Sequence, residues 1–260
     1  MYQHITLEKE KGVATVLLNK ADRFNLLDFE VLDELTSAMA RLNDDDEVGV
    51  VVLGTAKKEV FSGGADVDFM LSLTPARARK FVRTVHKACD SIRHLEKPVI
   101  AALSGHCLGG GCEMAMACDI RIAAENTRIG LPEIKAGIPS VVEAALMPRL
   151  IGMGKVREMV LTGDSIDAAE AERIGLVNKV VPLAGLGQAA RDMAGRILAN
   201  GPFAVRMQKD ILNKWMETDL AAAMEHSINC FALCFTTDEP RESMTAFKEK
   251  RKPRFKGDGR

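Results

Sequence analysis

Short apolar runs alternate with amphipathic stretches through the first half of the chain, and this alternation constrains the fold most. The runs at 13–18 (VATVLL), 48–53 (VGVVVL) and 99–103 (VIAAL) are rich in β-branched residues and bounded by polar residues or glycine, as buried strands are. Between them, residues 29–42 and 75–95 carry apolar side chains at helical spacing. This alternation predicts an α/β fold with at least some parallel strand pairing.

The second half of the chain changes from a mixed pattern to a helical one. Apolar runs at 120–123 and 176–181 continue the strands, but from about residue 186 only helical patterns follow, at 187–198, 202–216, 220–235 and 239–250. No linker rich in proline and glycine separates the two parts. We therefore expect an α/β core over residues 1–190 and a helical C-terminal region over residues 191–260 that covers the core or mediates assembly.

The composition is that of a globular protein. The chain has 260 residues, of which 47% are hydrophobic and 27% charged, so it can bury a large core. Its net charge of −1 gives no global electrostatic reason to expect a nucleic acid or an anionic membrane as partner. The first residues, MYQHITLEKEKG, lack the layout of a signal peptide, and no apolar run reaches the roughly 18 residues of a membrane span. These features predict a cytoplasmic protein without membrane or nucleic acid partners.

Six cysteines, at 89, 107, 112, 118, 230 and 234, are scattered through apolar segments. They form no CxxC pair, and no nearby histidine is expected to complete a zinc site. We therefore predict reduced core cysteines and no metal ion.

Two glycine-rich turns carry candidate chemistry. Residues 105–113 (GHCLGGGCE) place three glycines between a predicted strand and a helix whose first N–H groups lack partners, and residues 61–67 (FSGGADV) offer a second turn. Such N–H groups suit a developing oxyanion or a phosphate. The first segment matches neither GxGxxG nor GxxxxGK[ST], so dinucleotide and P-loop sites are not predicted. A single GGG is better explained as a tight strand-to-helix turn. The coincidence of several such turns favours a site, since two donors are the minimum for an oxyanion hole.

Two glutamates lie next to turns of this kind. Glu113 falls in the first turn of a largely apolar predicted helix, and Glu133 follows a proline in IGLPEIKAGIPS (129–140). Each alone is explained as an acid that compensates a helix dipole. Together with the glycine turns, they suggest a pair of carboxylates that face an oxyanion hole.

The order and spacing of FSGGADV, GHCLGGGCEMAMACDIRIA (105–123) and IGLPEIKAGIPS resemble the crotonase superfamily, specifically its enoyl-CoA hydratase and isomerase branch. The resemblance runs from LNKADRFNLLD (18–28) to MTAFKEKRKPRF (244–255). It implies a crotonase-like spiral of ββα turns with a helical C-terminal trimerisation region, assembled as a homotrimer or homohexamer. It also implies an enzyme of fatty acid metabolism with an acyl-CoA thioester substrate, so coenzyme A is part of the substrate and no separate cofactor is expected.

Carried onto this chain, the resemblance implies oxyanion-hole N–H groups on Ala65 and Gly110 and catalytic carboxylates on Glu113 and Glu133. In a hydratase, water adds across the C2=C3 bond of a 2-enoyl-CoA. Glu113 would act on the water and Glu133 chiefly on the proton at C2, although coupled carboxylates can share such roles. Many isomerases of the family keep only the second glutamate, so Glu113 favours a hydro-lyase over an isomerase or another acyl-CoA lyase.

The chain departs from the family after Gly137-Ile138-Pro139. Typical hydratases have a glycine-rich run there, whereas this chain reads SVVEAALMPRLIG (140–152), which leaves the acyl group of the substrate open. Ser140 and Glu143 match the capping box S-x-x-E, so Glu143 is predicted to cap a helix, with a third active-site acid as the alternative. His106 is the one histidine within a motif, and we expect it to pack under the glycine turn.

Further contacts with the acyl-CoA are implied by the same resemblance. The substrate-binding residues are Gly64, Asp66, Gly109, Ser140, Asn25, Ala21, Phe247 and Lys250, with Phe255 and Lys256 as alternatives to the last two. The loop at 20–25 would border the nucleotide, and the phenylalanine and lysine would reach the coenzyme A of a neighbouring subunit.

The C-terminal tail is basic. Residues 248–260 hold seven basic side chains against two acidic ones, which suits the phosphates of coenzyme A and equally a solvated helix end. A distant alternative is RNA binding through this tail. The aromatic content of 5% argues against that alternative, because stacking platforms for bases are scarce.

Overall fold

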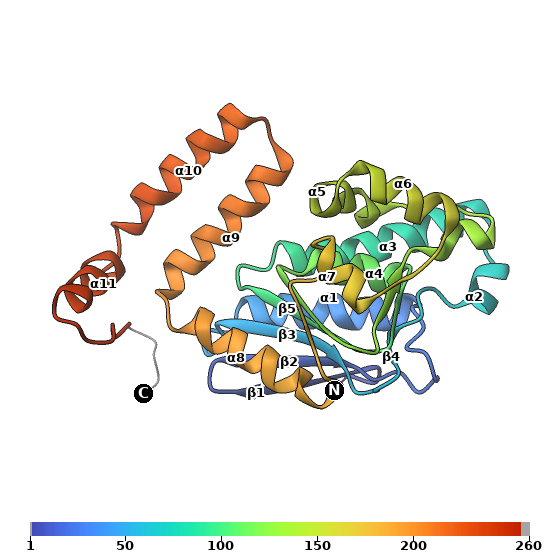
Figure 1. Ribbon diagram of the computed structural model, residues 1–260, viewed down its shortest axis with the longest axis horizontal. Coiled ribbons are helices and arrows are strands. Elements are labelled where there is room, and N and C mark those ends of the chain that lie inside the picture. Colours follow the sequence, from blue (N-terminus) through green and yellow to red (C-terminus); the bar gives the residue numbers. More distant parts are fainter. Residues whose placement is uncertain (1, 256–260) are drawn as a thin grey trace.

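The computed structural model describes residues 2–255, and its frame is a six-stranded sheet in the order β1-β2-β3-β5-β7-β10 (Figure 1). Its strands are β1 (Ile5–Glu10), β2 (Val13–Leu18), β3 (Val50–Thr55), β5 (Val99–Leu103), β7 (Ile120–Ala124) and β10 (Lys179–Val181). β1 pairs antiparallel with β2, and from β2 onward all neighbours are parallel. The predicted α/β fold with parallel pairing is confirmed.

A second, smaller sheet explains how the chain winds. Its order is β4-β6-β8-β9, formed by β4 (Val60–Ser62), β6 (His106–Leu108), β8 (Arg128–Gly130) and β9 (Ile166–Asp167). Each of β3, β5 and β7 is followed by one strand of this sheet and then by an α-helix or a 3-10 helix. The chain therefore forms the spiral of ββα turns that the resemblance implied.

Helices cover both faces of the large sheet (Figure 1). On one face, α1 (Phe29–Asn43), α3 (Pro75–Arg93) and α4 (Gly110–Ala117) contribute to the larger hydrophobic core, and α8 (Leu186–Leu198) covers the other face. Both long helices begin at a capping residue. The Asp28 side chain accepts from the Val31 N–H of α1, and Thr74 accepts from the Arg77 N–H of α3, where Pro75 suits the first turn.

Shorter elements complete the α/β part. They are α2 (Val67–Leu71), α5 (Met147–Ile151), α6 (Met153–Thr162) and α7 (Ala168–Arg173), with 3-10 helices η1 (Pro132–Ala136), η2 (Val142–Leu146) and η3 (Leu183–Gly185). The expected division at residue 190 falls inside α8, which packs on the sheet, and the division stays a prediction.

The last three helices are α9 (Pro202–Glu217), α10 (Leu220–Cys234) and α11 (Glu239–Lys248). Their bounds agree with the predicted helices to within two residues, and Figure 1 shows them extending away from the sheet with α9 and α10 side by side. Buried Lys209 ties α9 to the core, because its Nζ donates to the Ile92 and Lys97 carbonyls and lies 2.9 Å from Asp119. No helix within residues 2–255 is long and apolar enough to cross a membrane.

Two smaller predictions have opposite outcomes. All six cysteines are free thiols, five of them buried and Cys234 half-buried, which confirms reduced cysteines in the core. The prediction that His106 packs under the glycine turn is wrong. His106 is exposed at the start of β6, because side chains alternate along a strand and the next residue, Cys107, is the one that points into the core.

Candidate active site

Three segments with candidate chemistry meet at one edge of the small sheet. β4, β6 and β8 are parallel neighbours, so their carboxyl ends lie together. The turn of Gly63 and Gly64 follows β4, the turn of Gly109 and Gly110 follows β6, and Glu133 follows β8. The carboxyl edge of parallel strands is where α/β proteins bind ligands. The topology therefore brings together segments that are about 25 to 70 residues apart in the chain.

The two glycine turns are in direct contact, and this contact requires glycine. Gly64 has φ +90°, and a β-carbon there would lie 3.0 Å from the Leu108 carbonyl oxygen. Gly109 has φ +54°, and a β-carbon there would lie 2.8 Å from Oε1 of Glu133. Both positions combine a positive φ with a close neighbour, so a side chain at either would strain the backbone and displace that neighbour. The Gly109 position also shows that Glu133 lies against the turn.

Two backbone N–H groups beside these glycines lack an acceptor among the described residues. Leu27 pairs with the second turn by donating to the Gly64 carbonyl and accepting from the Asp66 N–H, at 2.8 and 3.3 Å. Successive N–H groups of extended backbone point to opposite sides, so the Ala65 N–H faces away from Leu27. Gly110 is the first residue of α4, where helix geometry provides no acceptor for its N–H. These are the two donors predicted for an oxyanion hole.

Glu113 is buried in the first turn of α4, with 4% of its surface exposed. Its Oε1 accepts from the Ala144 N–H of η2 at 3.2 Å, and a β-carbon on Gly110 would lie 4.0 Å from its Oε2. Burial, and secondly the charge of Glu133, raise the pKa of Glu113 to about 8. A carboxyl group with such a pKa can hold or release a proton near neutral pH, as acid–base catalysis requires.

Glu133 lies in the first turn of η1 and is partly exposed. The Ser140 hydroxyl donates to its Oε2 at 2.7 Å, while Oε1 is the atom that lies against Gly109. Ser140 therefore orients this carboxylate. Glu113, on α4, and Glu133, on η1, lie on either side of the turn of Gly109 and Gly110. Both carboxylates therefore lie beside the glycine turns, as predicted.

The capping-box prediction for Ser140 and Glu143 is wrong. The residue before η2 is Val141, and no side chain caps this helix. The Ser140 hydroxyl donates its hydrogen bond to Glu133 instead. Glu143 is buried, its Oε1 lies 2.7 Å from Nδ1 of His86, and its Oε2 is buried without a hydrogen-bond partner in the described part of the chain. Burial raises the pKa of Glu143, against an opposing effect of His86.

Glu143 is instead a third acid beside the pair. It adjoins Ala144, which binds Glu113, and its charge contributes to the raised pKa of Glu113. The alternative interpretation of Glu143 as an acid near the active site therefore fits the structure better than the cap. Sequence reasoning missed its partner His86, because an isolated histidine on an amphipathic helix carries no local signal.

The loop at 20–25, which was predicted to border the nucleotide, is held in place by hydrogen bonds of the buried Asn25 side chain. Asn25 has φ +49° and is 2% exposed, and its side chain accepts from the Lys20 N–H and donates to Thr55 Oγ1 and the Phe61 carbonyl. Ala21 is exposed on this loop. Asn25 therefore shapes the loop, and its own side-chain groups are already used within the protein. Asp66, also predicted to bind substrate, caps α2 by accepting from the Phe69 N–H.

The C-terminal residues predicted to bind coenzyme A lie far from these turns within one chain. Phe247, on α11, is 85% exposed, and Lys250 follows the helix with φ +55°. Figure 1 shows α11 at one end of the molecule, away from the α/β part that contains α4. Phe255 is buried at 9% exposure, and Lys256 lies outside the described residues.

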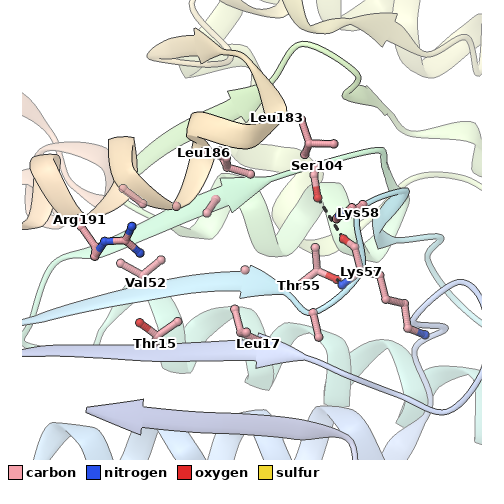
Figure 2. Close-up of a pocket in the computed structure, with 15 residues that line it drawn as sticks. Thr15, Leu17, Val52, Thr55, Lys57, Lys58, Ser104, Leu183, Leu186 and Arg191 are labelled. Atoms are coloured by element: carbon pink, nitrogen blue, oxygen red, sulfur yellow. Dashed lines mark hydrogen bonds between the residues drawn. The ribbon is translucent and has the colours of Figure 1, made fainter. Parts of the chain in front are cut away.

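A separate cavity of about 220 Å³ lies under α8, on the other face of the large sheet (Figure 2). Lys57, Arg191 and Ser104 are among its lining residues, and the Ser104 hydroxyl donates to the Lys57 carbonyl at 3.2 Å. None of the predicted site residues lines this cavity. It is therefore distinct from the cluster of glycine turns and carboxylates.

Sequence reasoning also missed a cluster outside this site. Asp210 of α9 and His226 and Cys230 of α10 bring three potential metal-ligating atoms within 4.8 Å of one another. The spacing of four residues between His226 and Cys230 was the available signal, since it places both on one face of a helix. The contribution of Asp210 comes from the packing of α9 on α10.

Comparison with known proteins agrees with the geometry. A sequence model of the enoyl-CoA hydratase/isomerase family matches residues 8–258. The chain is 43% identical to a crotonyl-CoA hydratase of Syntrophomonas wolfei over 98% of both proteins. It is 41% identical to a short-chain-enoyl-CoA hydratase of Clostridium acetobutylicum over 96% of both. The crystal structure of an enoyl-CoA hydratase from Bacillus anthracis superposes with a TM-score of 0.94 at 34% identity, covering 98% of this chain and 100% of that one. The chain therefore belongs to the enoyl-CoA hydratase/isomerase family.

Proposed function

We propose that this protein is an enoyl-CoA hydratase, a hydro-lyase that adds water across the C2=C3 bond of short 2-enoyl-CoA thioesters. The observation that carries the proposal is the convergence of Glu113 and Glu133 on the turn of Gly109 and Gly110, beside two N–H groups without acceptors in the described chain. The preference for short acyl chains is supported by relatives named crotonyl-CoA hydratase and short-chain-enoyl-CoA hydratase.

The N–H groups of Ala65 and Gly110 would hold the thioester oxygen. When water attacks C3, negative charge develops on this oxygen as the thioester becomes an enolate. Donors fixed by the backbone stabilise that charge without reorganising, and each contributes about 2.7 to 4 kcal/mol in comparable enzymes. The partial positive charge at the N-terminus of α4 acts in the same direction.

The two carboxyl groups would move the protons. In hydration, ionised Glu113 takes a proton from the attacking water as oxygen bonds to C3, and protonated Glu133 gives a proton to C2. In dehydration the protons run the other way, from Glu113 to the leaving hydroxyl and from C2 to Glu133. The pair therefore needs one proton in total. The pair can catalyse hydration when Glu133 carries this proton and dehydration when Glu113 carries it. Coenzyme A is part of the substrate, and no other cofactor enters these steps.

This mechanism predicts how the rate depends on pH. Because the pKa of Glu113 is raised to about 8, this carboxyl group keeps its proton below this pH and loses it above. We expect kcat/KM for dehydration of the 3-hydroxyacyl-CoA, the direction that needs protonated Glu113, to fall as pH rises through about 8. Glu143→Gln removes a charge that raises the pKa of Glu113, so it should move this fall to lower pH. Steady-state pH profiles of the wild type and of the variant test this, with Glu158→Gln on the exposed face of α6 as control. If the fall in kcat/KM occurs at the same pH in Glu143→Gln as in the wild type, the charge of Glu143 does not affect the pKa of Glu113.

An isomerase is the main alternative. Moving a double bond from C3=C4 to C2=C3 needs one base that carries a proton between carbons, and Glu133 alone could do this. The presence of a second, buried carboxylate in Glu113 favours water addition. A distant alternative, RNA binding through the tail, gains no support from the described residues.

We further propose that the protein assembles into trimers or hexamers, in which Phe247 and Lys250 reach the coenzyme A bound to a neighbouring subunit. Exposed apolar side chains along α10 and at the residue that follows it support assembly; they are Leu220, Met224, Ile228, Phe231 and Phe235. Exposed apolar surface that gathers on one element can mark a protein–protein interaction site. A cytoplasmic location and a role in fatty acid metabolism are parts of the same proposal.

A panel of thioesters tests the proposed function. Purified protein should consume crotonyl-CoA, seen as loss of absorbance of the conjugated thioester, and the rate should fall as the acyl chain lengthens. The matched substrate is but-3-enoyl-CoA, which an isomerase converts into crotonyl-CoA. If the protein converts but-3-enoyl-CoA into crotonyl-CoA and does not consume crotonyl-CoA, it is an isomerase and not a hydratase.

A further inference from the structure

Asp210, His226 and Cys230 form a compact cluster between α9 and α10, remote from the glycine turns (Figure 1). Nε2 of His226 lies 2.6 Å from Oδ2 of Asp210 and 3.4 Å from Sγ of Cys230, and that sulfur lies 3.7 Å from the same Asp210 oxygen. Three different donor atoms therefore converge on one point. Cys230 is buried, His226 is half-buried and Asp210 is exposed, so the point is reachable from solvent.

The arrangement is not that of a nucleophilic triad. In such a triad, one ring nitrogen of histidine binds the acid and the other faces the nucleophile, so that a proton can pass across the ring. Here the same nitrogen, Nε2, faces both the Asp210 oxygen and the Cys230 sulfur. A single nitrogen cannot donate to the acid and accept from the thiol at once. The convergence is what a chelating site requires instead.

Two of the three distances between these atoms are close to those of a tetrahedral metal site. With metal bonds of about 2.0 to 2.3 Å, neighbouring ligand atoms of a zinc site lie about 3.3 to 3.6 Å apart. The two distances to sulfur already match this range to about 0.1 Å. The distance between the nitrogen and oxygen is that of a hydrogen bond and would open by about 0.7 Å on binding a metal.

We propose that Asp210, His226 and Cys230 bind one zinc(II) ion, which links α9 to α10. A mixed set of one carboxylate, one imidazole and one thiolate suits zinc, while the thiolate disfavours magnesium and calcium. Among residues 2–255, no fourth histidine, cysteine or acidic group joins the cluster, so the fourth position is left for water or an added ligand. This site has no part in the proposed hydration and does not depend on it.

Binding of a metal ion would displace the protons of this cluster, because ligand atoms bind metals in their deprotonated forms. On binding, the metal–sulfur bond forms as the thiol proton leaves to solvent. The proton between Nε2 of His226 and Asp210 moves through solvent to Nδ1, so that Nε2 and the carboxylate oxygen can each form a metal bond. The ion would then stabilise the α9 and α10 pair, because it binds the folded arrangement and not the separated helices.

Cobalt(II) provides a direct test, because a thiolate bound to cobalt gives a charge-transfer absorption band. Full-length protein is stripped with a chelator, exchanged into buffer and titrated with cobalt(II). We expect the band to grow to one equivalent per chain and to be bleached when zinc(II) replaces cobalt(II). The affinity for zinc(II) follows from competition with a chromophoric chelator.

Variants separate the site from adventitious binding. Cys230→Ser should abolish the charge-transfer band, and Cys234→Ser, one turn along the same helix, should leave it. Asp210→Ala changes an exposed position and is not expected to disturb folding. It should weaken zinc(II) binding at least tenfold. The proposal is overturned if no band forms, if the band survives Cys230→Ser, or if Asp210→Ala binds zinc(II) as tightly as the unaltered protein.

Discussion

Glu113→Gln is expected to lower kcat for hydration of crotonyl-CoA by about 10² to 10⁴-fold, the usual contribution of a general acid or base. Glutamine has the same size and can still accept the hydrogen bond from the Ala144 N–H, so the packing around α4 is preserved. It cannot take a proton from water. The loss should appear in kcat, because the oxyanion donors that hold the thioester are unchanged.

The matched substitution for this experiment is Glu125→Gln, which changes an exposed acid after β7. Its kcat should equal that of the unaltered protein. Glu133→Gln should cause a loss of the same order as Glu113→Gln, and the double variant should lose much less than the product of the two, because the carboxylates act as a unit. If Glu113→Gln keeps a near-normal kcat, Glu113 does not act as an acid or base in the reaction.

Removal of one oxyanion donor is expected to have the second-largest effect. Gly110 is the first residue of α4, a position where proline fits a helix, and Gly110→Pro deletes the N–H that lacks an acceptor in the described chain. We expect kcat to fall by about 10² to 10³-fold. A side chain at this position also approaches a Leu27 methyl group, with the β-carbon at 2.9 Å, so the steric effect needs its own control.

Gly110→Ala supplies that control, because it introduces the same β-carbon and keeps the N–H. The ratio of kcat between the alanine and proline variants isolates the hydrogen bond from the crowding against Leu27. Circular dichroism of both variants checks that α4 and the sheet are retained. Equal rates in the two variants would show that the Gly110 N–H does not stabilise the transition state.

The sequence predicts the parts of this fold that depend on local patterns. The apolar runs of β2 and β5 are recovered with their observed bounds, and the C-terminal helices to within two residues. The strands β4, β6 and β8 have three residues each and carry too little periodicity to be recognised. Their pairing into one sheet is non-local, yet it is what brings the three candidate segments together. The resemblance to a family supplied that information in advance.

The capping-box prediction failed because of tertiary packing. The S-x-x-E pattern at Ser140 and Glu143 is a valid capping signal, but Glu133 takes the Ser140 hydroxyl and His86 takes the Glu143 carboxylate. Both partners are brought by tertiary packing, which a local pattern does not contain. The same holds for Asp210, which joins His226 and Cys230 only because α9 lies beside α10.

The incorporation of water oxygen tests the central claim most directly. Crotonyl-CoA is incubated with the enzyme in water labelled with oxygen-18, and the thioester product is analysed by mass spectrometry. The proposed reaction places one labelled oxygen at C3 of a 3-hydroxybutyryl-CoA product, and Glu113→Gln should suppress this labelling in proportion to its loss of kcat. Turnover of enoyl-CoA without any labelled oxygen in the product would contradict the account.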